Sequence, residues 1–150
     1  MEKNTGGKFI DLEKGQKYKG DLNTNGQPHG NGLLIWANGD KYEGVFKFGK
    51  RNGKGKRENK DGSTYNGEYL DDKPNGRGVY VWKDGEKYDG EWKDGKFHGK
   101  GTKTLPDKTI FEGTWEGGKP NGPGKCFYPD GGKFSGVWKN GQPHGLGCKT

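Results

Sequence analysis

Apolar and polar residues alternate along short stretches of this chain, in the pattern of half-buried β-strands. In one stretch Tyr65, Gly67 and Tyr69 occupy every second position, which predicts a strand. The polar run 71–75 interrupts the alternation and is predicted to be a loop. Alternation resumes over 76–82 as a second strand, and 83–85 follows as a hairpin turn. The pattern predicts two antiparallel strands and no helix.

This unit recurs along almost the whole chain. Its aromatic-x-Gly-x-aromatic motif returns every 23 residues, and an earlier copy at Tyr18 lies 24 residues before the next. A fixed period of this length indicates units that stack on their neighbours to bury apolar surface. We therefore predict an all-β fold, an elongated single-layer antiparallel meander of stacked β-hairpins. The predicted units are an N-terminal partial hairpin or cap at 1–17, then repeats at 18–41, 42–64, 65–87, 88–110, 111–133 and, in part, 134–150.

A second glycine motif, Gly-x-Gly, recurs in the second strand of each copy and indicates the hairpin register. If the turn is a three-residue loop with Gly85 in the left-handed region, then Gly90 faces Gly78 and Trp92 faces Gly76. Each large ring then lies over a bare glycine of the neighbouring strand. A two-residue loop would scatter the aromatic positions over two faces, so we expect the three-residue register.

Three copies depart from the pattern. The second strand after Tyr42 is polar, and Leu22 replaces an aromatic residue in the first copy. Lys108 replaces a turn glycine after 105–107, so that turn is expected to be looser or differently shaped. Pro106 cannot donate a ladder hydrogen bond.

The composition narrows the fold class. Only 25% of the 150 residues are hydrophobic and 32 are glycine, which is too little apolar volume for an ordinary two-layer core. Aromatic residues nevertheless make up 13%, a high share for a disordered chain. The rings should therefore supply most of the buried area. A repeat offers the same groups several times, whereas a catalytic site needs different groups that converge once, so neither an enzyme nor a cofactor is expected.

The chain is basic, with a formal net charge of +7 that comes mainly from lysine. The densest basic stretch, called the basic patch below, comprises Lys47, Lys50, Arg51, Lys54, Lys56, Arg57 and Lys60. It is either a solvated face or a contact for an acidic partner or a phosphoinositide-rich membrane. Nucleic acid is not expected, because arginine is scarce and the aromatic residues are needed for packing.

The cysteines and the distribution of apolar residues indicate the cellular compartment in which the protein is expected. Cys126 and Cys148 occupy positions of opposite parity in their predicted strands, so no disulfide is expected and a reducing, cytoplasmic location fits. No apolar run approaches the ~20 residues that would cross a bilayer, and the N-terminus resembles no signal peptide. Any membrane contact should be peripheral.

The histidines and the glycine pairs could be taken for ligand sites. His29, His98 and His144 precede Gly-x-Gly in a column filled elsewhere by asparagine. Because a two-strand repeat advances about 10 Å, histidines several repeats apart cannot share one metal ion. We expect these side chains to cap loop backbone groups instead. No helix or Lys-Ser/Thr follows the glycine pairs, so a phosphate loop is not predicted.

The repeat resembles that of a known family. The run Tyr88–Asp–Gly–Glu–Trp92, followed by His98–Gly99–Lys–Gly101, is very similar to the MORN (membrane occupation and recognition nexus) repeat, and the resemblance extends over 18–150. It implies a twisted, gutter-shaped sheet of hairpins. It also implies protein–protein scaffolding, commonly at cytoskeletal or membrane-associated structures, with lipid binding as an alternative.

The leading hypothesis is a non-enzymatic cytoplasmic scaffold that holds a peptide or helix of a partner protein in an aromatic groove. The predicted groove residues are Trp36, Tyr80, Trp82, Tyr88, Trp92, Trp115, Tyr128 and Trp138. These rings could instead serve packing alone.

One alternative function is a peripheral module that binds anionic phospholipids through the basic patch. Another is the targeting part of a larger lipid kinase or methyltransferase. The terminal strand near 145–150 could also pair edge to edge in a homodimer.

Overall fold

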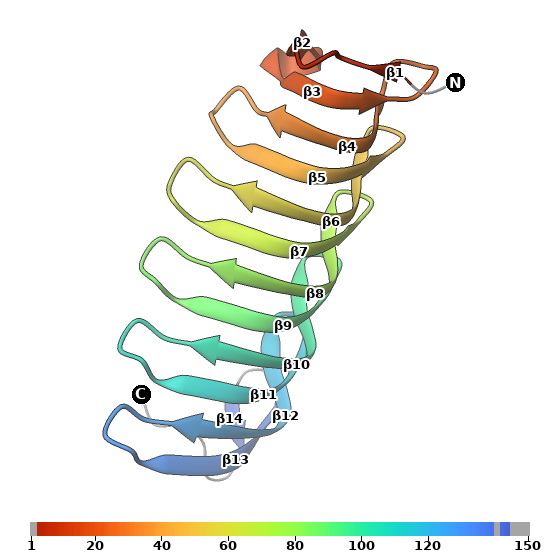
Figure 1. Ribbon diagram of the computed structural model, residues 1–150. Coiled ribbons are helices and arrows are strands. Elements are labelled where there is room, and N and C mark those ends of the chain that lie inside the picture. Colours follow the sequence, from red (N-terminus) through yellow and green to blue (C-terminus); the bar gives the residue numbers. More distant parts are fainter. Residues whose placement is uncertain (1–2, 140–141, 145–150) are drawn as a thin grey trace. The chain divides into compact units, whose positions relative to one another are not determined.

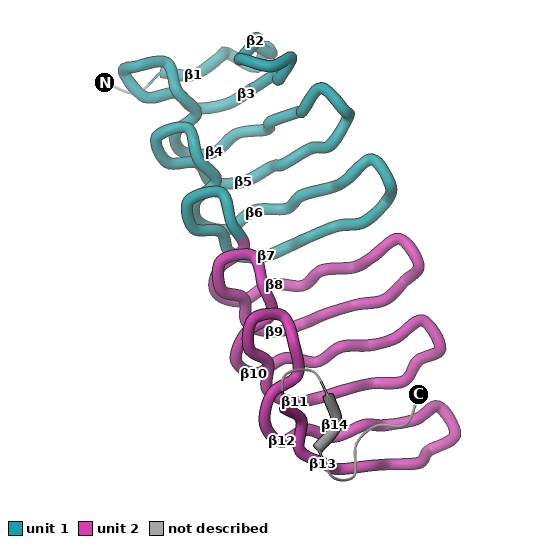
Figure 2. The backbone as a smooth tube through the Cα atoms, turned by 180° about the vertical axis from the view of Figure 1, so that it is seen from behind, with its two compact units in different colours: residues 1–73 teal, residues 74–150 magenta. Residues whose placement is uncertain are grey.

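The computed structural model describes residues 3–139 and 142–144 of the chain, which fall into two compact units, 1–73 and 74–150 (Figures 1 and 2). Both units consist of β-strands. The first has a short 3₁₀ turn at Glu13–Gly15 and the strands β1 (Lys3–Asn4), β2 (Ile10–Asp11), β3 (Lys17–Leu22), β4 (Pro28–Ile35), β5 (Lys41–Lys47), β6 (Lys50–Glu58) and β7 (Thr64–Leu70). The second has β8 (Lys73–Val81), β9 (Lys87–Lys93), β10 (Lys96–Thr104), β11 (Ile110–Glu116), β12 (Lys119–Phe127), β13 (Lys133–Lys139) and β14 (Gln142–His144).

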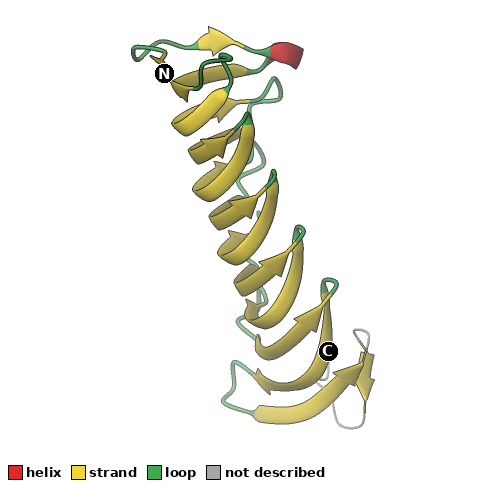
Figure 3. Cartoon of the chain, turned by 90° about the vertical axis from the view of Figure 1, so that its right-hand side faces the viewer, coloured by secondary structure: helices red, strands yellow, loops and turns green. Residues whose placement is uncertain are grey.

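Each unit is an antiparallel meander in which consecutive strands pair. In the first unit β3 to β7 pair in chain order, and β1 and β2 both pair with β3. In the second unit β8 to β14 pair in chain order. Figure 3 shows strands joined by short loops, and within the described residues helical structure is limited to the turn at Glu13–Gly15. The predicted all-β meander of hairpins is confirmed in both units. The edge strand proposed for a homodimer, near 145–150, lies outside the described residues.

The predicted hairpin register is also confirmed. Gly76 faces Trp92 and Gly78 faces Gly90 across β8 and β9. The backbone N–H of Trp82 donates to the carbonyl oxygen of residue 86 at 2.8 Å, and Gly85 has a φ of +92°. The loop therefore has three residues and ends in a left-handed glycine.

The turns at the other end of the strands differ from the prediction. The run 71–75 is not a five-residue loop, because only Asp71 and Asp72 lie outside the strands. The equivalent turns, Phe48–Gly49, Asp94–Gly95 and Gly117–Gly118, likewise have two residues with positive φ. This is the type I′ geometry, whose twist matches that of the flanking strands. A bulge then absorbs the extra residue, as at Gly99 in β10, where the register shifts.

The glycine of each aromatic-x-Gly-x-aromatic motif and the second glycine of each Gly-x-Gly pair form a continuous row across each unit, called the glycine row below. In the first unit these residues are Gly20, Gly32, Gly44, Gly55 and Gly67. In the second they are Gly78, Gly90, Gly101, Gly113, Gly124 and Gly136. Because side chains alternate along a strand, each sheet has two faces. The face that carries the aromatic residues of the repeats is called the ring face below. The opposite face, which carries the residues at the intervening strand positions, is called the polar face.

The core is the layer of rings on the ring face. The leading tyrosines of four repeats, Tyr18, Tyr42, Tyr65 and Tyr88, are almost fully buried. The Tyr88 ring lies over the glycine row, where a methyl group on Gly101 would overlap the tyrosine ring and its hydroxyl. Its hydroxyl donates to the carbonyl oxygen of Glu91 at 2.9 Å, and its ring meets Trp92 edge to face at 5.2 Å. Such ring pairs contribute about 0.5–1.5 kcal/mol each beyond their buried area.

The expectation of a differently shaped turn at Lys108 is wrong. The N–H of Leu105 donates to Thr109 O at 2.8 Å, as in the glycine-containing turns, and Lys108 itself has a φ of +79°. The hydrogen bonds of the turn thus impose the left-handed conformation even without glycine. The lysine Cβ bears a steric cost there that glycine avoids.

The expectation of a free thiol at Cys126 is also wrong. Its side chain is fully buried, and its sulfur takes part in a disulfide. The parity argument assumed a regular strand up to the second cysteine, whereas the described part of β14 ends at His144; Cys148 itself lies outside the described residues. The inference of a reducing compartment from unpaired cysteines therefore no longer holds.

We predict that Gly101→Ala destabilises the protein by about 1–3 kcal/mol, because its methyl group would overlap the buried Tyr88 ring. Thermal and urea unfolding followed by circular dichroism would measure the loss. Lys100→Ala, one residue earlier and exposed, is the matched control and should change stability by less than about 0.5 kcal/mol. Equal stability of the two variants would contradict the role assigned to the glycine row.

We predict that Lys108→Gly stabilises the protein by about 1 kcal/mol, because glycine adopts the required positive φ without a Cβ clash. The reciprocal change, Gly85→Lys, should destabilise it by a similar amount, since a Cβ at Gly85 would meet no other atom within 4 Å and only the backbone conformation is penalised. The midpoint of urea unfolding measures both effects. Two shifts of the same sign would refute this explanation.

Candidate partner-binding surfaces

The structure divides the eight predicted groove rings into two sets of four. Tyr88, Trp92, Trp115 and Trp138 are buried in the ring layer, with exposed fractions of 0–6%. The half-buried rings are Trp36 in the first unit and Tyr80, Trp82 and Tyr128 in the second. Only the half-buried set presents ring surface that a partner could contact.

The buried tryptophans also use their polar atoms within the sheet. The Trp92 indole N–H donates to the carbonyl oxygen of Gly78 at 3.0 Å, and that of Trp115 donates to Gly101 at 3.1 Å. Each ring thus closes over the glycine row of the neighbouring strand and is held there by a hydrogen bond. These residues stabilise the fold and position the exposed rings.

Two half-buried rings of the second unit, Tyr80 and Phe97, contact that of Trp82, in a group called the Trp82 cluster below. The Trp82 ring lies 4.6 Å from that of Tyr80 and 5.8 Å from that of Phe97, measured between centroids. The ammonium of Lys103 stands 5.6 Å from the Trp82 ring and forms a 2.7 Å ion pair with Glu86. The cluster therefore combines apolar ring surface with one fixed ion pair.

Sequence reasoning missed Phe97. Its ring stacks on Tyr88 at 3.9 Å and supports Trp82 edge to face. Phe97 lies opposite Trp92, the second aromatic residue of its repeat. The residues at the equivalent position of two other repeats are Pro120 and Arg51. The sequence did contain a signal for Phe97: its position in the repeat holds residues of different types in different copies. An aromatic residue at such a variable position indicates a surface that is specific to that copy.

The first unit covers its exposed ring with arginine. The guanidinium of Arg57 lies 4.4 Å from the Trp36 ring centroid and that of Arg51 lies 5.2 Å from it. Each arginine is fixed by a carboxylate, Arg51 by Asp72 and Arg57 by Asp40, both at 3.2 Å. The N–H of residue 60 and the Arg57 guanidinium also hold the pKa of the Asp40 carboxyl below its ordinary value. The two arginines thus cover part of the half-buried Trp36 ring.

The basic patch does not form one surface. Its two arginines lie on the ring face, where they contact Trp36, whereas Lys54 and Lys56 are exposed on the polar face. Lys47 and Lys50 flank the Phe48–Gly49 turn at the strand ends. The seven charges therefore cannot all meet the same flat partner.

His29 caps a turn, as predicted for its column. Its Nδ1 accepts a hydrogen bond from the backbone N–H of Phe48 at 3.1 Å, and the two rings lie 5.0 Å apart. Within residues 3–139 and 142–144 no three His, Cys, Asp or Glu side chains are grouped closely enough to hold a metal ion. The same described residues include no helix long and apolar enough to span a membrane.

Burial of the leading tyrosines has an electrostatic consequence. Removal from water raises the pKa of the Tyr18 and Tyr88 hydroxyls to about 12, with neighbouring Asp21 and Glu91 contributing further. The pKa values of Tyr42 and Tyr65 are raised for the same main reason. These hydroxyls remain neutral hydrogen-bond donors to the backbone and offer no nucleophile or base.

The fold and the site define a β-hairpin repeat protein in which one set of rings forms a buried core layer and a second set is half-buried. The chain belongs to the MORN repeat family, whose pattern matches residues 18–41, 42–64, 65–87, 88–110, 111–133 and 134–150. One relative is an inactive protein tyrosine kinase, pTKL, of Plasmodium berghei, which is 47% identical over 47 residues. That match covers 31% of this chain and 4% of the relative.

Two solved structures resemble the chain. The G-box domain of the microcephaly protein CPAP, studied for a role in centriole elongation, aligns with a TM-score of 0.54 and 17% identity, over 87% of this chain and 70% of that domain. The Drosophila melanogaster SAS-4 TCP domain, in complex with a proline-rich motif of Ana2, aligns with a TM-score of 0.49 and 16% identity, over 95% and 90% of the two chains. At these identities the likeness concerns the fold and assigns no partner to this chain.

Proposed function

We propose that this MORN repeat chain is a non-enzymatic scaffold that binds a segment of a partner protein through the Trp82 cluster. The observation that carries the proposal is that the Trp82 side chain is half-buried and contacts the rings of Tyr80 and Phe97. Its indole N–H makes no hydrogen bond within the described residues. Rigid, partly exposed tryptophan beside other rings is the usual anchor of a protein interface.

The contrast between the two units supports the choice of surface. In the first unit, arginine guanidiniums already occupy the faces of Trp36 and Tyr69. In the second, one lysine stands beside Trp82, and Phe97 takes the place of an arginine. A partner would displace water from apolar ring surface in the second unit, but an ion-paired side chain in the first. Desolvation therefore favours binding at the Trp82 cluster.

The chemistry of the cluster indicates the kind of partner. Ring surface at Tyr80 and Trp82 fits an aliphatic or aromatic anchor from a peptide or a helix. The Lys103–Glu86 ion pair lies beside the rings and offers a donor and an acceptor at the rim. We expect an apolar anchor with polar neighbours rather than a strongly charged segment.

We predict that peptides selected on the intact protein from a random display library lose at least about tenfold in affinity on Trp82→Ala. The matched control is Phe48→Ala, which removes a ring that is 61% exposed, at a turn of the first unit, and should leave affinity unchanged. Fluorescence anisotropy would give the affinities, and far-UV circular dichroism would verify folding. Unfolding of Trp82→Ala would make Trp82 a structural residue, and equal losses on the two variants would exclude the cluster.

A second candidate function, peripheral contact with an anionic membrane, is favoured by the Phe48 turn. Phe48 stands at the tip of this turn with a φ of +50°, a conformation that aromatic residues rarely adopt, and exposed Lys47 and Lys50 flank it. An exposed ring between two cations suits the interface of an anionic bilayer. This arrangement uses only part of the basic patch.

We predict that liposomes containing phosphoinositide sediment the protein, whereas neutral liposomes do not. Each basic residue near an anionic surface contributes about 1 kcal/mol, so Lys47→Glu with Lys50→Glu should release the protein. Lys54→Glu with Lys56→Glu, on the polar face, is the control of equal charge and should retain binding. Release by the control pair alone would place the contact on the polar face, and a lack of sedimentation would exclude the membrane function.

A further inference from the structure

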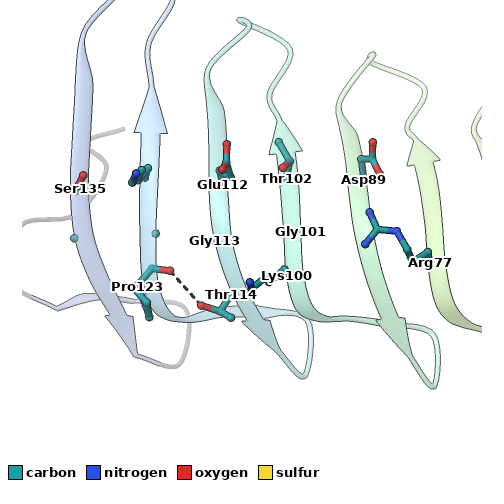
Figure 4. Close-up of a pocket in the computed structure, with 13 residues that line it drawn as sticks. Arg77, Asp89, Lys100, Gly101, Thr102, Glu112, Gly113, Thr114, Pro123 and Ser135 are labelled. Atoms are coloured by element: carbon teal, nitrogen blue, oxygen red, sulfur yellow. Dashed lines mark hydrogen bonds between the residues drawn. The ribbon is translucent and has the colours of Figure 1, made fainter.

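One edge strand of the first unit is paired differently from the strands inside the sheet. β5, β9 and β11 carry the aromatic-x-Gly-x-aromatic motif, and each pairs on both sides with a strand that carries Gly-x-Gly, called a Gly-x-Gly strand below. Figure 4 shows this arrangement in the second unit, where Gly101 and Gly113 lie side by side in the floor of a cleft of about 570 Å³. β3 pairs with a Gly-x-Gly strand, β4, on its inner side, whereas residues 3–11, called the cap segment below, cover its outer edge.

Next to its turn the cap segment follows the regular hairpin register. Ile10 faces Tyr18, and the equivalent residues of β8 and β9 face each other in the same way. Two residues earlier, this register would bring Lys8 opposite Gly20, a position that Gly78 holds in β8. The cap segment therefore has lysine where a Gly-x-Gly strand has its second glycine.

At Lys8 the cap segment turns away from β3. The N–H of Lys8 donates to the carbonyl oxygen of Thr5 at 3.3 Å, and both residues between them have positive φ. This turn interrupts the ladder between β1 and β2, each of which contributes two residue pairs. The N–H of Thr5 donates to the carbonyl oxygen of Gly20, and its Oγ1 accepts from the N–H of Gly20, both at 3.0 Å. The regular hairpin of β8 and β9, by contrast, has six consecutive pairs.

The cap segment is attached mainly by exposed contacts. None of the residues 3–11 is buried. The Phe9 ring is 44% exposed, and its centroid lies 4.9 Å from the ammonium of Lys19. The side chains of Asn4 and Asp11 bond to β3 on the exposed surface. Segments with few buried apolar contacts and exposed hydrogen bonds open at a small share of the free energy of global unfolding.

β3 itself is held more firmly. Tyr18 is fully buried, and its hydroxyl donates to the carbonyl oxygen of Asp21 at 2.6 Å. β3 also pairs with β4 from Lys17 to Leu22. We therefore expect the cap segment to leave the outer edge while β3 remains in the sheet.

We propose that the outer edge of β3 is a docking site for a Gly-x-Gly strand of another MORN repeat chain, and that the cap segment closes this site until such a strand displaces it. The incoming strand adds a continuous antiparallel ladder to the edge. In this mode of binding, main-chain hydrogen bonds give affinity and the side-chain pattern gives specificity. The glycines of the strand would face Leu22 and Gly20, and an apolar residue would face Tyr18, as in the hairpin of β8 and β9.

The side chain of Leu22 is the reason for glycine in the incoming strand. In β9 the equivalent residue, Trp92, faces Gly76 and donates its indole N–H to the carbonyl oxygen of Gly78. Leu22 is half-buried at this position of β3. Bare glycines would let it extend over the incoming strand, whereas larger residues would occupy the same space.

The experiment titrates a fluorescent peptide, Pro-Asn-Gly-Arg-Gly-Val-Tyr-Val, with the full chain and follows anisotropy; the peptide copies residues 74–81. The comparison peptide, Pro-Asn-Arg-Gly-Val-Gly-Tyr-Val, has the same composition, but its glycines are moved by one position, so that side chains fall on the glycine row. We expect the copied peptide to bind at least about fivefold more tightly. Equal affinity of the two peptides would overturn the proposal.

A variant that opens the cap segment tests its role. Thr5→Pro removes both the N–H that donates to Gly20 and the hydroxyl that accepts from it. The copied peptide should bind this variant at least about fivefold more tightly than the unaltered chain, because apparent affinity rises with the fraction of molecules whose edge is free. Thr24→Pro is the matched control, since Thr24 is exposed at a turn position that favours proline, and should leave affinity unchanged. Equal affinity for Thr5→Pro and Thr24→Pro would overturn the role of the cap segment.

Hydrogen exchange locates the bound peptide, and far-UV circular dichroism verifies that the variants are folded. The N–H of Gly20 should exchange faster in Thr5→Pro than in the unaltered chain, and the copied peptide should restore its protection. Trp82→Ala should bind the peptide normally, so the outcome is independent of the Trp82 cluster. Binding without protection of Gly20, or no binding to Thr5→Pro, would overturn the assignment.

Discussion

The contact between a leading aromatic ring and a bare glycine is the constraint on which the rest of this structure depends. A sheet one layer thick has no second sheet or helix to cover its apolar side, so it must bury its rings against its own backbone. The Tyr88 ring reaches the backbone because Gly101 has no Cβ, and the tyrosine hydroxyl then finds a carbonyl acceptor three residues further along its own strand. Repetition of this contact explains why only about a quarter of the residues need to be hydrophobic.

The same constraint explains which features the sequence predicted. A ring and the glycine beneath it must appear as fixed columns, so the register of Trp92 opposite Gly76 followed from spacing alone. Turns are constrained less by residue type. Asp71 and Asp72 adopt the type I′ geometry that more often contains glycine, and Lys108 adopts a glycine conformation because the hydrogen bonds of its turn require it. A polar run therefore indicated a turn but not its length.

The site was harder to predict than the fold, for a related reason. Alternation assigns Trp92 and Trp82 alike to the ring face, but it does not say which ring another ring covers. That depends on diagonal neighbours, such as Phe97 beside Trp82 and Arg57 over Trp36. The same limit applies to Arg51 and Arg57, which looked like surface charge in the sequence yet pack on rings and pair with carboxylates. Basic residues that are close together in the sequence therefore need not lie on the same face of the sheet.

Because the ring–glycine contact stabilises the sheet, residues at positions outside this contact can vary while the sheet is retained. The position opposite the second aromatic residue of a repeat shows this freedom, since it holds arginine at Arg51 and phenylalanine at Phe97. Arginine there covers the neighbouring rings with an ion-paired side chain, whereas phenylalanine extends the apolar surface to Trp82. The polar face varies in the same way, because its side chains leave the core undisturbed. A uniform repeat can thus present different surfaces in its two units.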